Sequence, residues 1–370
     1  FPDGRKAVIV MTGDDHARHG TRNRFNQYYA ESPTNSSPLD WRNIRSTSFL
    51  FPYLNPIDGS RTDGPPLTES EVTNWIAEGF DISLHLDTAC ADFTTWDSLN
   101  AMFTNEMSAL KTMYPGLPPM LTHRAHCVTW SQYTMLPEVE RANGIRLDTT
   151  YYYWPGDWVA SWPGLFTGSG MPMRFATADG SVIDNYQAVT QMTDESGQVY
   201  PYTVNTLIQR AVGPEGYYGA FVANRQTVDT DYTNYESQAD SDAIVAAATN
   251  SHVAVISAKQ LLTWVDARDA SSFSSILSTN GNLTFSVSAS TNAIGLQAMA
   301  PVPLGQMAGQ VKSNGVALAF STSRIKGINY AIFPARTGSY EVDYAPDTTL
   351  PGVAAITPDN ATTDVGLRST

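Results

Sequence analysis

The stretch Ala7–His16, AVIVMTGDDH, puts two aspartates and a histidine directly after a run of apolar residues. A short apolar run rich in β-branched residues is typical of a buried strand. Adjacent carboxylates repel each other, and burial makes that repulsion stronger. A chain that keeps Asp14 and Asp15 together where such a strand surfaces therefore needs a chemical reason for the pair.

The same pattern recurs along the chain, as short apolar runs that end in reactive polar residues. It is repeated at Phe80–Thr88, Pro119–Cys127, Gly144–Trp154, Tyr217–Gln226 and His252–Gln260. Helical patterns lie between these runs, and one of them starts with a capping box at Thr68 and Glu71 and ends at Gly79. Strands that alternate with helices indicate a parallel sheet covered by helices. We therefore expect an α/β fold, a distorted (β/α) barrel of about seven strands with its reactive groups at the strand C-termini.

The pattern changes after Arg268, where short alternating runs are broken by Gly, Asn and Pro. Such runs are typical of antiparallel sheets. We expect a barrel domain over residues 1–268, a small all-β sandwich over 269–346, and a linker over 347–370 that leads into a further β-sandwich module of the same parent chain.

Composition limits the function classes. The chain has 370 residues and a net charge of −14, with no basic face for phosphate groups, so nucleic acid is an unsuitable partner. No apolar run has the length needed to cross a bilayer, so we expect no membrane insertion. The abundance of Tyr, Trp, Ser, Thr, Asn and Gly predicts a protein that is secreted or held at the cell surface.

Histidines occupy several of the predicted strand ends. His85 closes one strand, and His126 follows Arg124 at the end of another. A catalytic divalent metal needs about three N or O ligands and one open position. Asp15, His85 and one further His or Asp would suffice. The aspartate pair then has a reason, because one carboxylate binds the metal and Asp14 stays free as a general base.

Four motifs in order resemble those of the polysaccharide deacetylases, the NodB-type fold of carbohydrate esterase family 4 and its relatives. TGDDH resembles the T-F-D-D motif of that family, and GFDISLHLDT resembles the motif in which a histidine opens an H-[ST]-x-x-H pair. THRAHC takes the place of the R-x-x-P-Y motif, and IRLDTTYYYWPGDW resembles the Asp/Trp motif of the acetyl pocket. The resemblance extends from about Lys6 to Arg268.

The resemblance implies a metal-dependent deacetylase, with zinc as the expected cofactor, that removes N-acetyl groups from the amino sugars of a polysaccharide. It implies that Asp14 is the base, that Arg124 orients Asp14, and that Asp15 and His85 bind the metal. Substrate-binding residues would be Trp154, Asp157 and Trp158.

Two family positions differ in this chain. Ala89 stands where the second metal histidine of the family would be, so the third ligand must come from elsewhere. We favour His126, with His16 and Asp87 as alternatives. The late L-x-H motif, which supplies the general acid, is also missing, and its place offers Gln226. His252 starts a predicted strand, and we expect it to be structural.

The two cysteines could form a disulfide, remain buried thiols or bind a metal. Cys90 lies five residues after His85, and Cys127 follows His126. If those strands are neighbours the thiols are close, so we favour a disulfide between two loops of the site.

Three other functions remain open. A glycoside hydrolase would need two carboxylates about 5–9.5 Å apart, for which Asp14 with Asp148 or Asp157 could serve. The missing histidines would suit a non-catalytic carbohydrate-binding relative. An amidohydrolase for small molecules is the third.

Overall fold

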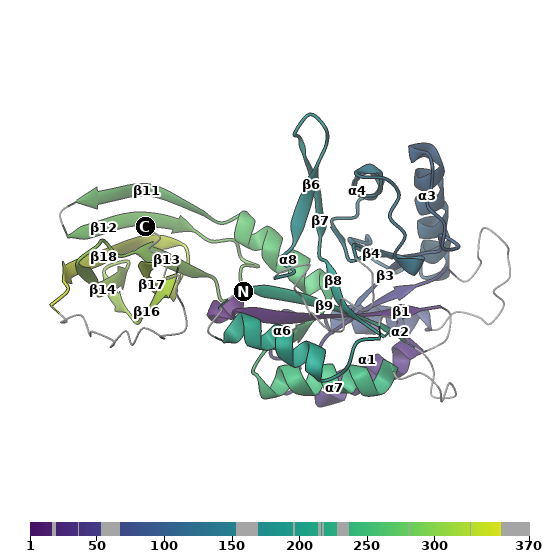
Figure 1. The fold of residues 1–370 in the computed structure, drawn as a ribbon, viewed down its shortest axis with the longest axis horizontal. Helices are drawn as coiled ribbons and strands as arrows, with labels where there is room; N and C mark the ends of the chain where they lie inside the picture. The colour runs from purple at the N-terminus through teal and green to yellow at the C-terminus, as the bar shows by residue number, and fades with distance from the viewer. Residues whose placement is uncertain are drawn as a thin grey trace, which may run out of the picture. The chain divides into compact units, whose positions relative to one another are not determined.

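The computed structural model describes two compact units (Figure 1). The described residues are 1–16, 20–35, 37–52, 67–152, 169–194, 197–213, 216, 218–227, 237–279, 281–325 and 327–348. The larger unit consists of Phe1–Ser272 together with Ala289–Gln297, and the smaller consists of Phe273–Ser288 and the chain from Ala298 onward.

The larger unit is built on a curled, mostly parallel sheet of ten strands. These strands are β1 (Ala7–Asp15), β2 (Thr47–Leu50), β3 (Asp81–Leu86), β4 (Thr122–Ala125), β5 (Leu147–Asp148), β6 (Met173–Ala176), β7 (Val182–Gln187), β8 (Thr190–Thr193), β9 (Gly219–Gln226) and β10 (Ala254–Ile256). Their order is β6-β7-β5-β4-β3-β2-β1-β9-β8, and β10 pairs with β1. Residues 188–189 alone separate β7, which lies next to one edge of the sheet, from β8 at the other edge, so the sheet has to curl.

The α/β class agrees with the sequence, but the number of strands differs from the expected seven. β6 adds an antiparallel partner to β7, and β10 pairs only with Val8–Val10 of β1. β7 and β8 continue one another but pair at opposite ends of the sheet, with β5 and β9. Short pairings of this kind leave no periodicity of their own in a sequence.

Helices accompany the parallel strands. They are α1 (Gly20–Glu31), α2 (Glu69–Ala77), α3 (Trp96–Met113), α4 (Met135–Ala142), α6 (Tyr202–Val212), α7 (Ser237–Asn250) and α8 (Ala258–Asp269), with short 3₁₀ turns at Pro2–Gly4 and His126–Val128. The predicted capping box of α2 is confirmed. The Thr68 hydroxyl accepts from the backbone N–H of Glu71, and the Glu71 carboxylate accepts from the backbone N–H of Thr68.

The central strand β1 is buried along its whole length, and its alternate side chains enter two different core clusters. Ile9 and Met11 pack in one cluster, whereas Val8 and Val10 pack in the other. Successive side chains of a strand point to opposite faces of its sheet. Continued along β1, this alternation directs Asp14 and Asp15 to opposite faces.

The smaller unit contains two further sheets. Their strands are β11 (Ser272–Thr279), β12 (Asn282–Ser288), β13 (Gln297–Pro301), β14 (Gln306–Ser313), β15 (Val316–Leu318), β16 (Ser321–Ile325), β17 (Ile328–Pro334) and β18 (Gly338–Pro346). Phe285 of one sheet lies 6.4 Å, ring centre to ring centre, from Phe333 of the other, and Tyr340 stacks on Phe285 at 5.4 Å. The two sheets thus share an aromatic core, as in a β-sandwich. Among the described helices of the chain, none is long and apolar enough to cross a membrane.

Candidate functional site

Asp14 is the centre of a polar cluster inside the curled sheet. Its carboxylate is buried, with Oδ1 lying 3.4 Å from Nε of Arg124 on β4. The side-chain amide of Asn224 on β9 donates to Asp14 Oδ2 at 2.9 Å. Arg124 in turn donates to the hydroxyls of Thr12 and Thr190, at 3.2 and 2.8 Å. Four strands therefore fix the position of one carboxylate.

His85, at the end of β3, has a defined tautomer. Its Nδ1 lies 3.0 Å from the backbone carbonyl of Arg124, and because a carbonyl only accepts, Nδ1 carries the proton. Nε2 is left as an acceptor, 3.1 Å from Nε2 of His16 and 3.9 Å from Asp14 Oδ2. Burial, with the nearby His16 and His126, lowers the pKa of His85 well below its ordinary value. The ring is therefore neutral, as a metal ligand must be.

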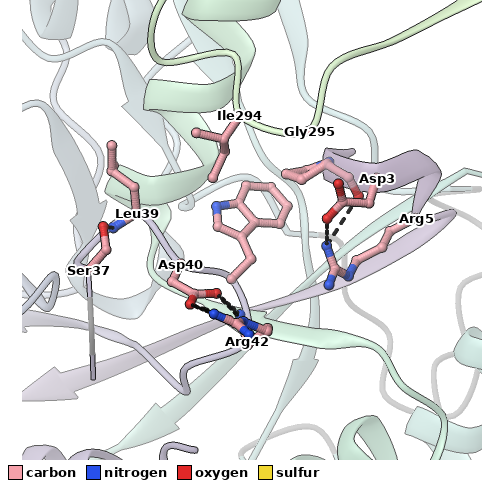
Figure 2. A pocket seen from close by; sticks show the side chains of 10 residues that line it. Asp3, Arg5, Ser37, Leu39, Asp40, Arg42, Ile294 and Gly295 are labelled. Carbon is pink, nitrogen blue, oxygen red and sulfur yellow. Dashed lines mark hydrogen bonds and ion pairs between the residues drawn. The ribbon is translucent and has the colours of Figure 1, made fainter. Parts of the chain in front are cut away.

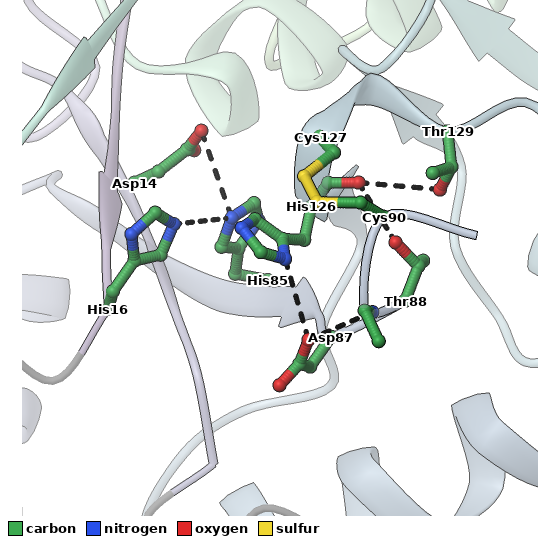
Figure 3. The surroundings of a disulfide bond; sticks show 10 residues. Asp14, His16, His85, Asp87, Thr88, Cys90, His126, Cys127 and Thr129 are labelled. Carbon is green, nitrogen blue, oxygen red and sulfur yellow. Dashed lines mark hydrogen bonds and ion pairs between the residues drawn. A yellow bond between two sulfur atoms is a disulfide. The ribbon is translucent and has the colours of Figure 1, made fainter. Parts of the chain in front are cut away.

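His126 brings a third imidazole to the same place (Figure 3). Its ring centre lies 5.0 Å from that of His16 and 5.4 Å from that of His85, and the Phe51 ring contacts all three. Nδ1 of His126 is 3.4 Å from Oδ1 of Asp87. We call His16, His85 and His126 the histidine cluster.

Two members of the histidine cluster stand at a spacing that suits a shared metal ion. Two ligands at about 2.0–2.1 Å from one tetrahedral zinc ion are about 3.4 Å apart, close to the 3.1 Å between the facing nitrogens of His16 and His85. The backbone carbonyl behind His85 and the carboxylate behind His126 are outer partners of the type that orients metal-binding histidines. His16 and His85 thus fit a shared divalent metal, whereas the groups of three possible ligands within 4.8 Å among the described residues are Cys90, His126 and Cys127, and His123, Glu140 and Asp148.

Asp15 has a different environment from Asp14. Its Oδ2 accepts hydrogen bonds from the backbone N–H and the hydroxyl of Thr21 at the start of α1, at 3.2 and 2.6 Å. Asp15 points toward Thr21 and away from Asp14 because successive side chains along β1 alternate between the two faces of the sheet. The role of Asp15 as a metal ligand stays a prediction. The alternative ligand His16 lies beside His85 in the structure.

Asp148 lies in a second cluster rather than beside Asp14. Its Oδ1 is 3.3 Å from Nδ1 of His123, which also lies 2.7 Å from Oε1 of Glu140 on α4. The ring of His123 packs on Phe103 of α3, so this cluster occupies the layer between sheet and helices. His123 precedes Arg124 on β4 and faces the other way. Asp148 therefore lies with His123 in the helix layer, whereas Asp14 lies with Arg124 on the other face, which disfavours Asp14 and Asp148 as a pair of glycosidase carboxylates.

The remaining predicted residues are distributed as follows. Gln226 is the register partner of Asp14 on β9, and its backbone N–H donates to Asp194 at 2.8 Å. His252 stands just before β10, at the opposite end of the sheet from Asp14. Trp154, Asp157 and Trp158 lie outside the described residues. Sequence reasoning missed Asn224 and Phe51, although both follow apolar strand runs.

The favoured disulfide between Cys90 and Cys127 is confirmed. It links the segments that follow β3 and β4, with 5.2 Å between the two Cα atoms. The hydroxyl of Thr88 also donates to the backbone carbonyl of His126 at 3.0 Å. The segment that carries His126 is therefore held to the segment that follows His85 by one covalent and one hydrogen bond.

A pocket of about 320 Å³ lies at the other end of β1 (Figure 2). Its charged lining is paired internally, Arg5 with Asp3 at 3.1 Å and Arg42 with Asp40 at 2.6 Å. Asp3 and Arg5 precede β1, whereas Asp14 lies near its C-terminal end. This pocket is thus separate from the histidine cluster.

No known family model and no curated protein sequence matches this chain. Among solved structures, it is distantly similar to a pseudoenzyme of the CE4 family, with 8% identity and a TM-score of 0.38 over 70% of this chain and 68% of the other. The catalytic domain of a peptidoglycan N-acetylglucosamine deacetylase from Eubacterium rectale matches at 12% identity and a TM-score of 0.29, over 70% of this chain and 90% of that one. A GH29 α-L-fucosidase from Bacteroides thetaiotaomicron matches at 9% identity and a TM-score of 0.35, over 93% and 94%.

Proposed function

We propose that this protein is a metal-dependent deacetylase that removes N-acetyl groups from the amino sugars of a polysaccharide. The observation that carries the proposal is the arrangement around Asp14, which is held by Arg124 and Asn224 beside the neutral His85. We further propose that the protein acts outside the cell, in keeping with its composition.

In the proposed mechanism, His85, His126 and either Asp15 or His16 would hold the metal. When bound, the metal would activate a water molecule and polarise the acetyl carbonyl. Asp14 accepts the proton of the attacking water as general base, and the amine that leaves when the C–N bond breaks takes up that proton, so the products are acetate and a free amine. Arg124 and Asn224 keep its carboxylate in one orientation, so that it does not have to be reoriented during the reaction.

Acetate release tests the proposal directly. Oligomers of N-acetylglucosamine and of N-acetylgalactosamine would be incubated with the protein plus zinc, with a chelator, and with Asp14→Asn. We expect zinc-dependent release that the chelator abolishes and that Asp14→Asn lowers at least about 100-fold, because an amide cannot act as the base. Asp97→Asn, an exposed position at the start of α3, is the matched control and should keep full activity. Release that survives both the chelator and Asp14→Asn would contradict the mechanism.

The substitution Arg124→Lys tests whether Arg124 acts by orienting the Asp14 carboxylate or by maintaining the metal site. A lysine keeps the positive charge but loses the planar group that reaches Asp14, Thr12 and Thr190 together. We expect kcat to fall about 10–100-fold while zinc stoichiometry, measured by elemental analysis, stays unchanged. A loss of zinc together with kcat would instead assign Arg124 to the integrity of the metal site.

A non-catalytic carbohydrate-binding protein is the second candidate, favoured by Ala89 at the position of the family's second metal histidine. It predicts that the chain binds zinc and sugar without acetate release from either oligomer series.

A further inference from the structure

Four aromatic residues form a connected cluster, which we call the rim cluster. Trp130, Tyr151 and Phe175 contact one another with ring centres 5.1–5.9 Å apart, and Tyr133 joins through Phe175 at 5.4 Å. They come from three segments, after β4, after β5 and on β6. Three of these four contacts have interplanar angles of 68–81°, which is the edge-to-face arrangement that aromatic pairs prefer.

The rim cluster lies close to the candidate site along the chain. Trp130 follows His126 by four residues, which limits their Cα separation to about 14 Å. The backbone N–H of Ala125 donates to the Thr150 hydroxyl at 2.8 Å, which ties the segment before His126 to the segment before Tyr151. The cluster therefore extends the C-terminal edge of the sheet on the β4–β5 side.

The cluster is both anchored and accessible. Trp130 packs against the main hydrophobic core, and Tyr151 and Phe175 are half-buried. Tyr133, by contrast, is 66% exposed. Large rigid aromatic side chains offer contact area at a small cost in conformational entropy, and their polar ends stay hydrated.

We propose that the rim cluster is a subsite for pyranose rings of the polysaccharide, binding sugars more than one position away from the one that is held at Asp14. The proposal rests on the proposed function for the identity of the polymer. A sugar ring presents an apolar C–H face and a polar periphery, which matches the exposed ring of Tyr133 with its phenolic hydroxyl. A polymer that reaches Asp14 on this side of the sheet would pass over Tyr133 and its neighbours.

The subsite is tested by calorimetry with the full chain, which measures its affinity for N-acetylated oligosaccharides of two and of six sugars. We expect Tyr133→Ala to weaken binding of the six-sugar oligomer about fivefold and to leave the two-sugar oligomer unaffected, because the shorter ligand does not reach the rim cluster. Tyr133→Phe should bind like the unaltered protein, since it keeps the ring. Tyr202→Ala, which truncates a 54% exposed tyrosine on α6, is the matched control and should change neither affinity.

Equal affinities of Tyr133→Ala and the unaltered protein for the six-sugar oligomer would overturn the proposal, as would an absence of binding by the unaltered protein. Acetate release is measured separately on the same samples. Length-dependent binding that Tyr133→Ala weakens, without any acetate release, would support the subsite and contradict the deacetylase function.

Discussion

Replacing His85 by glutamine is expected to remove bound zinc and to lower acetate release by about 1,000-fold or more. His85 is the histidine whose tautomer, burial and lowered pKa all favour a neutral ligand with Nε2 directed toward Asp14 and His16. A metal ion contributes several kcal/mol to this class of reaction, and each 1.4 kcal/mol corresponds to a factor of ten in rate.

Zinc affinity would be measured by competition with a chelating dye, and activity by acetate release. His252→Gln, a histidine at the opposite end of the sheet, is the matched control and should change neither quantity. Full zinc affinity in His85→Gln would show that the metal, if there is one, is bound elsewhere.

The same measurement decides between Asp15 and His16. The hydrogen bonds from Thr21 to Asp15 favour a structural role for that carboxylate, so we expect His16→Asn to weaken zinc binding more than Asp15→Asn does. The opposite order would assign the third ligand to Asp15, as the resemblance to the deacetylases implies.

The second large effect concerns stability at alkaline pH, through His123, Glu140 and Asp148. All three side chains are buried. Burial by itself would lower the pKa of His123, but the hydrogen bonds with Asp148 and Glu140 outweigh it and raise that pKa to about 9. Burial, followed by the negative charge of Asp148, raises the pKa of Glu140 to about 8. Both groups thus bind protons more tightly in the folded chain than in the unfolded chain.

The sign of the effect follows from this difference. The contribution of Glu140 is complete below its ordinary pKa of 4.5 and is lost as pH rises through about 8. The contribution of His123 is complete below 6.5 and is lost as pH rises through about 9. We therefore expect the free energy of unfolding to decrease between pH 6.5 and 9, by about 5 kcal/mol, because the folded state holds more protons there.

Thermal unfolding at half-unit steps of pH measures this decrease, expected as a drop in Tm of about 10 °C. Glu140→Gln removes one of the two titrating groups and should flatten the profile, whatever its effect on stability at pH 6. Glu138→Gln, on the same helix, is the matched control and should keep the slope of the unaltered protein. A steep alkaline decrease in Glu140→Gln would show that other groups titrate.

The sequence by itself determined the local and sequential features of this protein. Alternating strand and helix patterns predicted the α/β unit, and the Thr68–Glu71 capping box marked the start of α2. The strand-end positions of Asp14, His85 and Arg124 also followed, because parallel strands bring their C-termini to one edge. The pairing of Cys90 with Cys127 followed from the same reasoning.

Only the tertiary structure decided which of these side chains meet. His16 reaches His85, and Asn224 reaches Asp14, across strands that are far apart in the sequence. Asp148 is directed to His123 in the helix layer instead. Side-chain direction alternates at every residue of a strand, so one residue of register decides the face, and register depends on how the strands pair and the sheet curls. That curl is a property of all its strands together and leaves no mark in any single stretch of the chain.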